Sequence, residues 1–349
     1  MADVLVIGGG VIGLATALEL RQRGATVTVL ERDVCGQAAT WAAGGMLAPE
    51  AERLEGDLRE LGIRSRSLYA EWIRKIVHLT GQSCGYWCCG ILAPISCSDA
   101  DAETVKEHPK YIDRLQLDKR QSGLGDSVSG ALWLSEDGQV DNRLLARALI
   151  LALRSLDVEI LEGTSVDRIV TQGDRVLHLE TSRGKLQAEH YLLATGAWTR
   201  SLLPLPISPR KGQMLSVFDP NRSLQTVIFG KNTYLIPRQD GTLVIGATVE
   251  DVEFAPGNTG AGMHRLLSQA IALYPAIADM TIQETWWGFR PHAPNEIPIL
   301  GASHYENLSL ATGHYRNGIL FAPITAQFLT DWICDRKVDP LLKALSDFR

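Results

Sequence analysis

The chain has 349 residues, of which 45% are hydrophobic and 21% charged, a composition typical of a globular protein and unlike a disordered chain. The formal net charge of −6 argues against nucleic acid as a main partner, because nucleic-acid-binding proteins carry an excess of basic residues. The start lacks the basic and apolar regions of a signal peptide, and no apolar run reaches the ~18 residues of a membrane span, so we expect a cytoplasmic protein with one large domain or two interleaved ones.

The cysteines indicate reduced thiols and no metal site. They form no Cys-x-x-Cys pair and no matching histidine spacing, which argues against zinc. In a chain of this length without a secretion signal, we expect them to remain unpaired. They are Cys35, Cys84, Cys88, Cys89, Cys97 and Cys334.

The N-terminal segment predicts a strand, a glycine turn, a helix and a second strand. After a continuously apolar run come Gly8, Gly10 and Gly13, spaced as G-x-G-x-x-G. The second strand, over residues 26–30, ends at Glu31. In this pattern the glycines allow a tight turn and close approach of a pyrophosphate, the helix N-terminus attracts phosphate, and the acid accepts hydrogen bonds from ribose. We therefore predict dinucleotide binding, although this pattern alone does not choose between FAD and NAD.

A segment rich in glycine and alanine follows, over residues 35–52. Gly44 and Gly45 let its backbone lie against a flat or charged group, and Trp41 is unusual in a flexible surface loop. We predict that this segment contacts the cofactor. Beyond it we expect a helix over 58–79, a strand with a turn over 84–97, surface helices or loops over 99–125, a strand over 131–134, a turn over 138–141 and a helix from Asp141, as N-cap, to about Leu156.

The second half of the chain predicts two kinds of sheet. We expect a strand over 158–161, a hairpin over 166–170 and 176–180, and a buried strand over 190–198. Short, mostly antiparallel strands then follow over 217–218, 226–229, 233–236 and 243–248, with a helix from 260 to about 274. The last segment has the same strand, turn and helix pattern as the N-terminal segment. We expect a buried strand over 308–311, a turn over 312–318 and a helix over 319–333 that has Pro323 in its first turn.

Several segments together carry a resemblance to a known family. They are the opening fingerprint, WAAGGMLAPEAE, LLATGAW, TYLIPRQDGTLVIGAT, WWGFRPHAPNEIPILG and TGHYRNGILFAP. With them the chain resembles the FAD-dependent amine oxidases of the D-amino-acid oxidase group, and within that group the glycine oxidases, from residue 3 to about 335. GFRP near 290 and GHYRNGI near 316 are the most specific segments.

The resemblance implies an α/β fold in which a Rossmann-like FAD-binding domain is interleaved with a mainly antiparallel-sheet α+β substrate domain. Residues 1–76, 138–207 and 288–349 would form the first domain, and residues 77–137 and 208–287 the second.

The resemblance also implies FAD, held non-covalently, as the cofactor. It assigns residues of four segments to FAD in addition to the three glycines of the fingerprint. They are Val11 and Ile12 at the turn; Glu31 and Arg32 at the ribose; Ala39, Thr40, Gly44, Gly45 and Met46 along the pyrophosphate and flavin; Val166 at adenine; and His314, Tyr315, Arg316, Asn317, Gly318, Ile319 and Leu320 at the flavin ring.

Two arginines and a tyrosine are the candidate substrate residues. A guanidinium grips a carboxylate with two charge-assisted hydrogen bonds. Arg290, among aromatic neighbours, matches the family's carboxylate-binding arginine, and Tyr234 matches the tyrosine that adds a further hydrogen bond. Arg316 matches a second arginine on the substrate side. The alternatives are a surface charge, packing between sheets and bracing of a loop, respectively; for His314 we prefer a backbone contact with the flavin over a general base.

The resemblance implies oxidative deamination of glycine and other small amines, such as sarcosine and small D-amino acids. The products would be the imino or oxo acid, ammonia and hydrogen peroxide, with molecular oxygen as acceptor, and the imine would feed thiazole synthesis for thiamine. Positioning of the neutral amine near the flavin would supply much of the rate enhancement. A homo-oligomer is compatible with the sequence, and from the position of Arg349 we expect no fused thiazole synthase domain.

Three alternatives remain at this point. The chain could be a D-amino-acid oxidase, a sarcosine oxidase or a quinone-linked amino-acid dehydrogenase of the same group. It could instead be a nicotinamide-dependent Rossmann reductase. A non-catalytic flavin-binding module is the least favoured, because a substrate clamp made of Arg290 and Tyr234 would then have no purpose.

Overall fold

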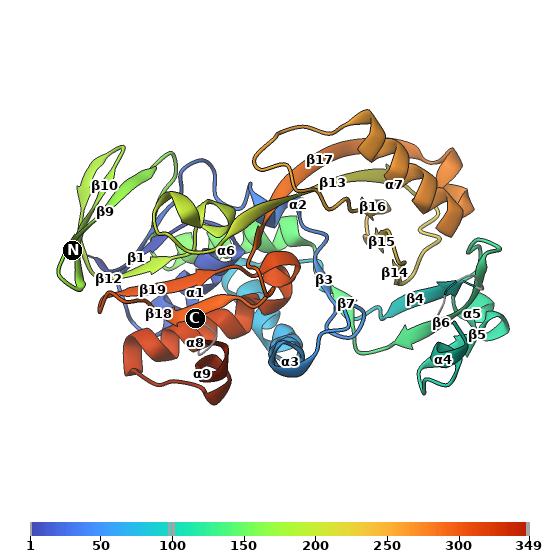
Figure 1. Cartoon of the computed structure of the whole chain (residues 1–349), viewed down its shortest axis with the longest axis horizontal. Helices are drawn as coiled ribbons and strands as arrows, with labels where there is room; N and C mark the ends of the chain where they lie inside the picture. The colour runs from blue at the N-terminus through green and yellow to red at the C-terminus, as the bar shows by residue number, and fades with distance from the viewer. Residues whose placement is uncertain (1, 97–98, 100–101, 347–349) are drawn as a thin grey trace.

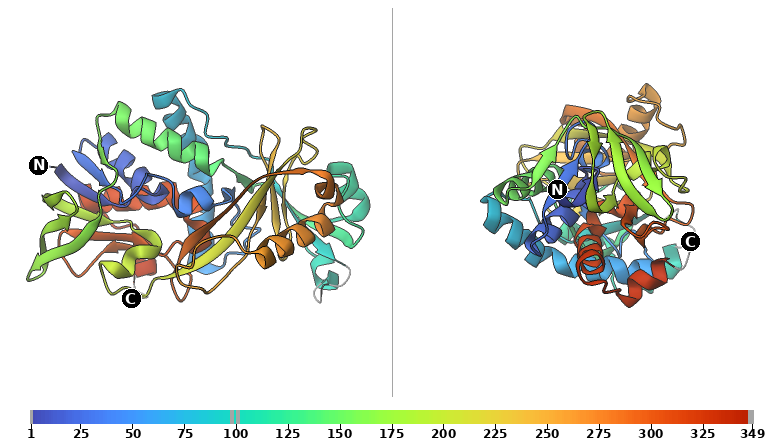
Figure 2. Two further views of the ribbon diagram at one scale, coloured as in Figure 1. Left: turned by 90° about the horizontal axis from the view of Figure 1, so that it is seen from above. Right: turned by 90° about the vertical axis from the view of Figure 1, so that its left-hand side faces the viewer.

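The computed structural model describes residues 2–96, 99 and 102–346, and most of its strands gather into two large sheets. The six-stranded and the eight-stranded sheet lie toward opposite ends of an elongated molecule (Figures 1 and 2). Cys97, the last residue of the strand predicted over 84–97, lies outside the described residues. None of the described helices is both long and apolar enough to cross a bilayer.

The six-stranded sheet is built around β1 (Ala2–Ile7). β2 (Val27–Leu30) pairs with one side of β1 and β12 (Ala188–Leu193) with the other, both parallel to it. The chain therefore winds away from β1 in both directions, which opens a crevice at the carboxyl ends of β1 and β12. The outer strands are β8 (Glu159–Leu161), β19 (Leu308–Thr312) and β18 (Ile299–Ala302), the last of which is antiparallel to β19.

Each face of this sheet is buried by a different layer. Helices pack on one face, around Leu14 and Leu18 of the first helix. They are α1 (Val11–Gln22), α3 (Gly56–Thr80), α6 (Asn142–Ser155), α8 (Gly318–Asp335) and α9 (Pro340–Ser346). A three-stranded sheet covers the other face, formed by β9 (Val166–Gln172), β10 (Arg175–Thr181) and β11 (Gly184–Leu186).

The eight-stranded sheet is antiparallel except where β14 and β4 pair. Its strands, in spatial order, are β17 (Thr281–His292), β13 (Ser208–Phe218), β16 (Thr242–Gly246), β15 (Tyr234–Pro237), β14 (Val227–Phe229), β4 (Ile91–Ser96), β6 (Val128–Leu134) and β5 (Tyr111–Asp113). α7 (Gly260–Leu273) packs on one face, while the other face meets Ala42, Ala48 and Ala51 of the glycine- and alanine-rich segment.

Short elements connect these layers. They are α2 (Ala39–Ala42), β3 (Met46–Leu47), β7 (Gly138–Gln139), α4 (Ala102–Lys106), α5 (Arg114–Arg120) and the 3-10 turns η1 (Gly196–Ser201), η2 (Pro275–Asp279) and η3 (Tyr315–Asn317). β3 and β7 pair with each other between the two sheets (Figure 1).

The predicted α/β architecture, with one mainly parallel and one mainly antiparallel sheet, is confirmed, and Asp141 caps α6 by accepting hydrogen bonds from Arg143 and Leu144. Several predicted bounds are wrong. The strand predicted over 190–198 ends at Leu193, because the chain turns at Gly196, whose φ is +53°. β13 is far longer than residues 217–218, since its pairing with β17 sustains it.

Two other differences depend on pairing with distant strands. The turn predicted over 138–141 begins as β7, because residues 138–139 pair with β3. The polar stretch over 99–125 contains β5, which pairs with β6.

Pro323 lies in the second turn of α8 and not in its first, because the helix begins at Gly318. A proline at this position has no N–H to offer the carbonyl of Ile319. The hydroxyl of Tyr69 on α3 donates to that carbonyl instead, and Ser65 Oγ donates to the carbonyl of Leu320 at 2.6 Å. Two α3 side chains therefore satisfy the backbone groups near the proline.

Candidate active site

A cleft between the two sheets gathers most of the predicted site residues. It contains about 1140 Å³ of empty space, including its open mouth. The start of α1, the segment 39–52, the eight-stranded sheet and the η3–α8 junction form its walls. The predicted residues that line it are Gly10, Val11, Ile12, Ala39, Thr40, Gly44, Gly45, Met46, Tyr234, Arg290, His314, Tyr315, Arg316, Asn317, Gly318 and Ile319.

A second cavity adjoins the first and shares Gly10 and Ala39 with it. The predicted residues Gly8, Glu31, Arg32 and Val166 line this second cavity. Gly13 and Leu320 line neither. Gly13 packs against the turn, and Leu320 lies against α3, with a methyl carbon 3.5 Å from the position of a Cβ on Gly62.

The glycine turn leaves no room for side chains. Gly8 has a φ of +112°, and a Cβ there would lie 2.4 Å from the carbonyl oxygen of Ala194 on the neighbouring strand segment. A Cβ on Gly13 would lie 2.0 Å from the carbonyl oxygen of Gly8. Glu31 secures the turn by accepting hydrogen bonds from the N–H groups of Gly9 at 2.8 Å and Asp33 at 3.0 Å.

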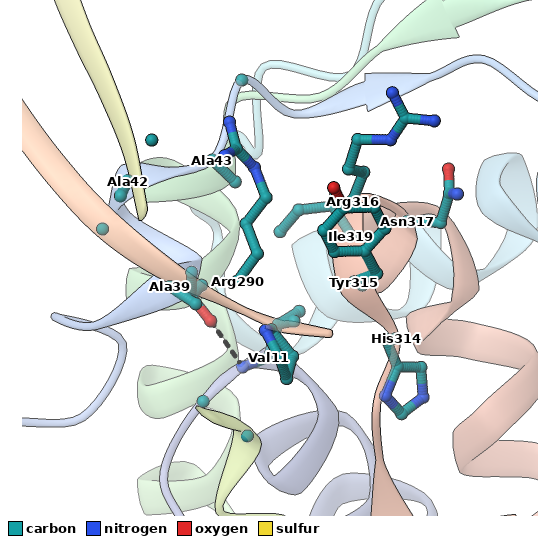
Figure 3. A pocket seen from close by; sticks show the side chains of 18 of the residues that line it. Val11, Ala39, Ala42, Ala43, Arg290, His314, Tyr315, Arg316, Asn317 and Ile319 are labelled. Carbon is teal, nitrogen blue, oxygen red and sulfur yellow. Dashed lines mark hydrogen bonds between the residues drawn. The ribbon is translucent and has the colours of Figure 1, made fainter. Parts of the chain in front are cut away.

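Two helices begin at the cleft, and neither is capped by the side chain of its own N-cap residue. Gly10 precedes α1 and Asn317 precedes α8, and neither first turn contains an acidic residue. Thr40 Oγ1 accepts from the N–H of Val11 at 2.9 Å (Figure 3). The positive ends of both helix dipoles therefore face a common space, as a diphosphate or an anionic ring requires.

The glycine- and alanine-rich segment lines that space with small residues and packs closely against the chain behind it. Gly45 has a φ of +78°, and a Cβ there would lie 2.1 Å from the carbonyl oxygen of Val140. Helix N-termini without an N-cap side chain, together with this wall of small residues, fit a dinucleotide with a planar ring. We conclude that the residues present can hold FAD.

Arg290 and Tyr234 lie on the sheet where neighbouring glycines make room for them. A Cβ on Gly212 would lie 2.4 Å from both terminal nitrogens of Arg290, and a Cβ on Gly246 would lie 2.5 Å from the ring of Tyr234. Arg290 Nη1 also donates to the carbonyl of Thr248 at 3.1 Å. The bare backbone of adjacent strands thus lets a guanidinium and a phenol reach the cleft.

The phenol of Tyr234 is suited to remain neutral. Burial raises its pKa, and the nearby Arg290 acts against this rise. A neutral hydroxyl beside a guanidinium can donate to the same carboxylate. The pair therefore presents the donors that a carboxylate needs.

Arg316 pairs with Glu52, a residue that the sequence interpretation missed. Arg316 Nη2 lies 3.0 Å from Glu52 Oε2, and 3.9 Å from a carboxylate oxygen of Glu296. The Glu52 side chain is 8% exposed and lines the cleft. Burial raises the pKa of Glu52, while Arg316 and then Arg290 act against the rise. The signal for Glu52 in the sequence was an acidic residue in a segment made up mostly of small residues, which was expected to contact the cofactor.

His314 and Trp41 point away from the cleft. Figure 3 shows Arg290 and Arg316 extending in one direction and the His314 ring in the opposite one. The ring lies 3.2 Å from Thr325 Oγ1, and burial lowers its pKa to about 3. The preferred interpretation of His314 as a backbone contact thus fits its geometry better than a general base. Trp41 stacks against Arg143, whose guanidinium carbon is 4.2 Å from the ring centroid.

A second missed residue is the buried Arg238, which ties the cleft wall together. It donates to the carbonyl of Gly44 at 2.8 Å and to Asn142 Oδ1 at 3.0 Å. It also donates to Gln139 Oε1 at 2.6 Å and to the carbonyl of Val140 at 3.1 Å. One guanidinium thus holds the glycine segment, β7 and the start of α6 in register.

The geometry agrees with sequence comparison. The family described as FAD dependent oxidoreductase matches residues 3–332. The chain belongs to this family. Its cofactor is therefore FAD, and it is an enzyme, so the nicotinamide-dependent reductase and the non-catalytic module are set aside.

Named relatives narrow the comparison within the family. The bifunctional protein ThiO/ThiG of a Nostoc species is 52% identical over 97% of this chain and 54% of its own length. The chain thus spans about half the length of this curated relative. A glycine oxidase of Pseudomonas aeruginosa is 34% identical over 97% of this chain and 96% of its own length.

Solved structures support the same family fold. The crystal structure of glycine oxidase from Geobacillus kaustophilus has a TM-score of 0.91 and 31% identity, with 97% of this chain and 96% of that chain covered. An L-proline dehydrogenase from P. horikoshii, at 21% identity and a TM-score of 0.88, shares the fold.

Proposed function

We propose that this chain catalyses the FAD-dependent oxidation of glycine and other small amines, with molecular oxygen as acceptor and hydrogen peroxide as product. The observation that carries the proposal is that Arg290 and Tyr234 line the same cleft as the N-termini of α1 and α8. The names of the relatives, glycine oxidase and ThiO/ThiG, agree with this substrate and with a role in thiamine biosynthesis.

The proposed roles of the site residues follow from their chemistry. Arg290 binds the substrate carboxylate through two parallel hydrogen bonds, and Tyr234 donates a further one. This clamp fixes the α-carbon of the substrate, so that reaction requires little further ordering. Held by the start of α1, the segment 39–52 and the start of α8, FAD would supply a two-electron acceptor for the hydrogen of that carbon, one that molecular oxygen can reoxidise.

The FAD contacts also remain proposals. We propose that the cleft and the adjoining cavity together hold FAD non-covalently, with the positive ends of α1 and α8 facing its anionic parts. We further propose that the six-stranded sheet, with its helices, and the eight-stranded sheet are the cores of the two interleaved domains predicted from the sequence. A cytoplasmic location and a homo-oligomeric state stay predictions.

A substrate panel on the purified holoenzyme tests the activity. We expect hydrogen peroxide release with glycine, and weaker release with sarcosine and D-proline. Release with D-proline alone, or reduction of a quinone without peroxide, would overturn the proposal in favour of another member of the group. Omission of each amine in turn is the control for adventitious oxidation.

A further inference from the structure

Glu52 places a carboxyl group in a site that is built to bind a carboxylate. Its side chain is 8% exposed, and its backbone N–H donates to the carbonyl of Ala48 at 2.9 Å, which closes a turn at the end of the glycine- and alanine-rich segment. Burying an ionised carboxylate is unfavourable unless a charged partner compensates it. The presence of Glu52 in the cleft therefore calls for an explanation.

The partner of Glu52 is the second arginine of the cleft. Glu52 Oε2 lies 3.0 Å from Arg316 Nη2, although the two groups are not aligned for a hydrogen bond and Oε2 has no hydrogen-bond partner among the described residues. Arg290, by contrast, has no carboxylate of the described residues within ion-pair distance; it donates to the carbonyl of Thr248 and lies beside the Tyr234 hydroxyl. Glu52 thus pairs directly with Arg316 and acts on Arg290 only from a greater distance.

The second acidic neighbour of Arg316 is much less effective. Glu296 lies 3.9 Å from Arg316 Nη2, and its side chain is 49% exposed. Water screens an exposed pair of this kind, so that its energy is small. The buried Glu52 therefore dominates the charge that Arg316 presents to the cleft.

We infer that Glu52 determines the charge selectivity of the site: by compensating Arg316 it restricts the cleft to substrates with one carboxylate and excludes amines that carry a second acidic group. This inference rests on the proposed function, because it takes Arg290 as the clamp for the first carboxylate. A second acidic group would meet the Glu52 carboxylate, and like charges brought together without water repel strongly. Specificity would then come from a repulsive element beside the attractive one.

Removal of the negative charge should turn Arg316 into a second anion site. We would titrate the holoenzyme and its Glu52→Gln variant with glycolate, which has one carboxylate, and with malonate, which has two, and read binding from the flavin absorbance. We expect Glu52→Gln to tighten malonate binding relative to glycolate by about tenfold, equivalent to ~1.4 kcal/mol. With D-aspartate and glycine as substrates, the ratio of kcat/KM should move in the same direction.

Three further variants separate charge selectivity from a loss of structure. Glu296→Gln removes the exposed neighbour of Arg316 and should change the malonate-to-glycolate ratio by less than about twofold. Glu52→Asp keeps the charge and should retain most of the wild-type selectivity. In Glu52→Gln/Arg316→Met the gain for malonate should disappear, because the guanidinium that receives the second carboxylate is absent.

Two results would overturn the inference. One is a Glu52→Gln variant that binds FAD and whose affinities for malonate and for glycolate change by the same factor. The other is a gain for malonate that persists without Arg316. The binding of malonate and glycolate is measured without turnover. Failure to oxidise glycine would therefore contradict the proposed function, whereas the inference on Glu52 is tested separately by the ratio of the two binding constants.

Discussion

At the scale of single residues, charge and bare backbone define the candidate site. Arg290 has room because Gly212 on the paired strand has no side chain, and Tyr234 has room because of Gly246. Glu52 and Arg316 form the second charged element of the cleft. These contacts depend on atoms that lie within a few ångströms, so single substitutions should test them sharply.

Replacing Arg290 with alanine should mainly abolish substrate binding. The loss of two charge-assisted hydrogen bonds to a carboxylate removes about 3 to 4 kcal/mol, or roughly a hundredfold to a thousandfold in kcat/KM for glycine. FAD should remain bound, because the substitution leaves the helix N-termini unchanged. Steady-state kinetics and the flavin spectrum measure both effects.

Arg210 provides a matched control for this substitution. It lies opposite Arg290 in the β13–β17 pairing and forms an ion pair with Asp251 instead of lining the cleft. Arg210→Ala should change kcat/KM by less than about threefold, because this partly exposed pair lies outside the cleft. Equal effects of the two substitutions would remove Arg290 from the site.

At the scale of elements, the packing of α3 against α8 compensates for the proline in α8. Tyr69 is fully buried, and its hydroxyl donates to the Ile319 carbonyl that Pro323 cannot satisfy. Ser65 extends the same contact by one residue. The helix that begins at the cleft is therefore held by side chains of its neighbour.

Tyr69→Phe should destabilise the protein by about 1 to 3 kcal/mol, because it leaves a buried carbonyl without a donor. The free energy of unfolding, measured with urea, reports this loss. In a Pro323→Ala background the new N–H can reach the Ile319 carbonyl, so the same substitution should have a smaller effect. An equal loss in both backgrounds would show that the hydroxyl does not serve this carbonyl.

His190 links β12 to β19 and makes the sheet sensitive to acid. It lies 2.9 Å from Ser309 Oγ, and burial lowers its pKa to about 4 from the ordinary 6.5. As the pH falls below 6.5, the His190 imidazole becomes protonated in the unfolded state, whereas in the folded state it stays neutral down to about pH 4. Folding stability is therefore lost over this range, by up to about 3 kcal/mol.

Comparison with His190→Gln isolates this contribution. Glutamine stays neutral and can still bond to Ser309, so the difference in unfolding free energy, wild type minus variant, should fall as the pH is lowered from 7 to 4. His314 is present in both proteins and cancels. A difference that is constant with pH would show that His190 is not held in its neutral form.

At the scale of the whole molecule, the site exists because the two sheets meet. Residues of the eight-stranded sheet, of the segment 39–52 and of the helix N-termini at the six-stranded sheet together line the cleft. The elements α2 and β3 of that segment lie between the two sheets in Figure 1. Arg238 connects β15 to Gly44 and to the start of α6 across this junction. Because Arg238 is buried, water could not take over its hydrogen bonds if the side chain were removed.

Arg238→Met should loosen this junction and weaken FAD binding. Several buried acceptors would lose their donor, which costs about 3 to 5 kcal/mol in stability for a buried charged group of this kind. We expect a lower thermal midpoint and a larger Kd of the apoprotein for FAD. Arg168→Met removes an exposed arginine paired with Glu180 and should change neither quantity measurably. Unchanged FAD affinity in Arg238→Met would contradict the role in holding the cofactor loop.

Much of the dinucleotide turn and of the helix and strand pattern was accessible from the sequence, because these features are local. Gly8 needs a positive φ, α6 needs a capping acid at Asp141, and β1 needs a continuous apolar run; each requirement is expressed by a residue and its near neighbours. The resemblance of distinctive segments also pointed to Arg290 and Tyr234. The bounds of β13 and β5 could not be predicted from the sequence, because pairing with distant strands extends β13 and creates β5.

The amino-acid sequence by itself determined the glycine turn, much of the order of helices and strands and the family to which the chain belongs. Only the tertiary structure decided that Glu52 pairs with Arg316, that Tyr69 donates to the carbonyl left by Pro323, and that Arg238 joins the end of β15 to Gly44 and the start of α6. The physical reason is one of range. Backbone preference and hydrophobic period act between neighbours in the chain, whereas a buried charge or carbonyl is satisfied by whichever residue packing brings beside it.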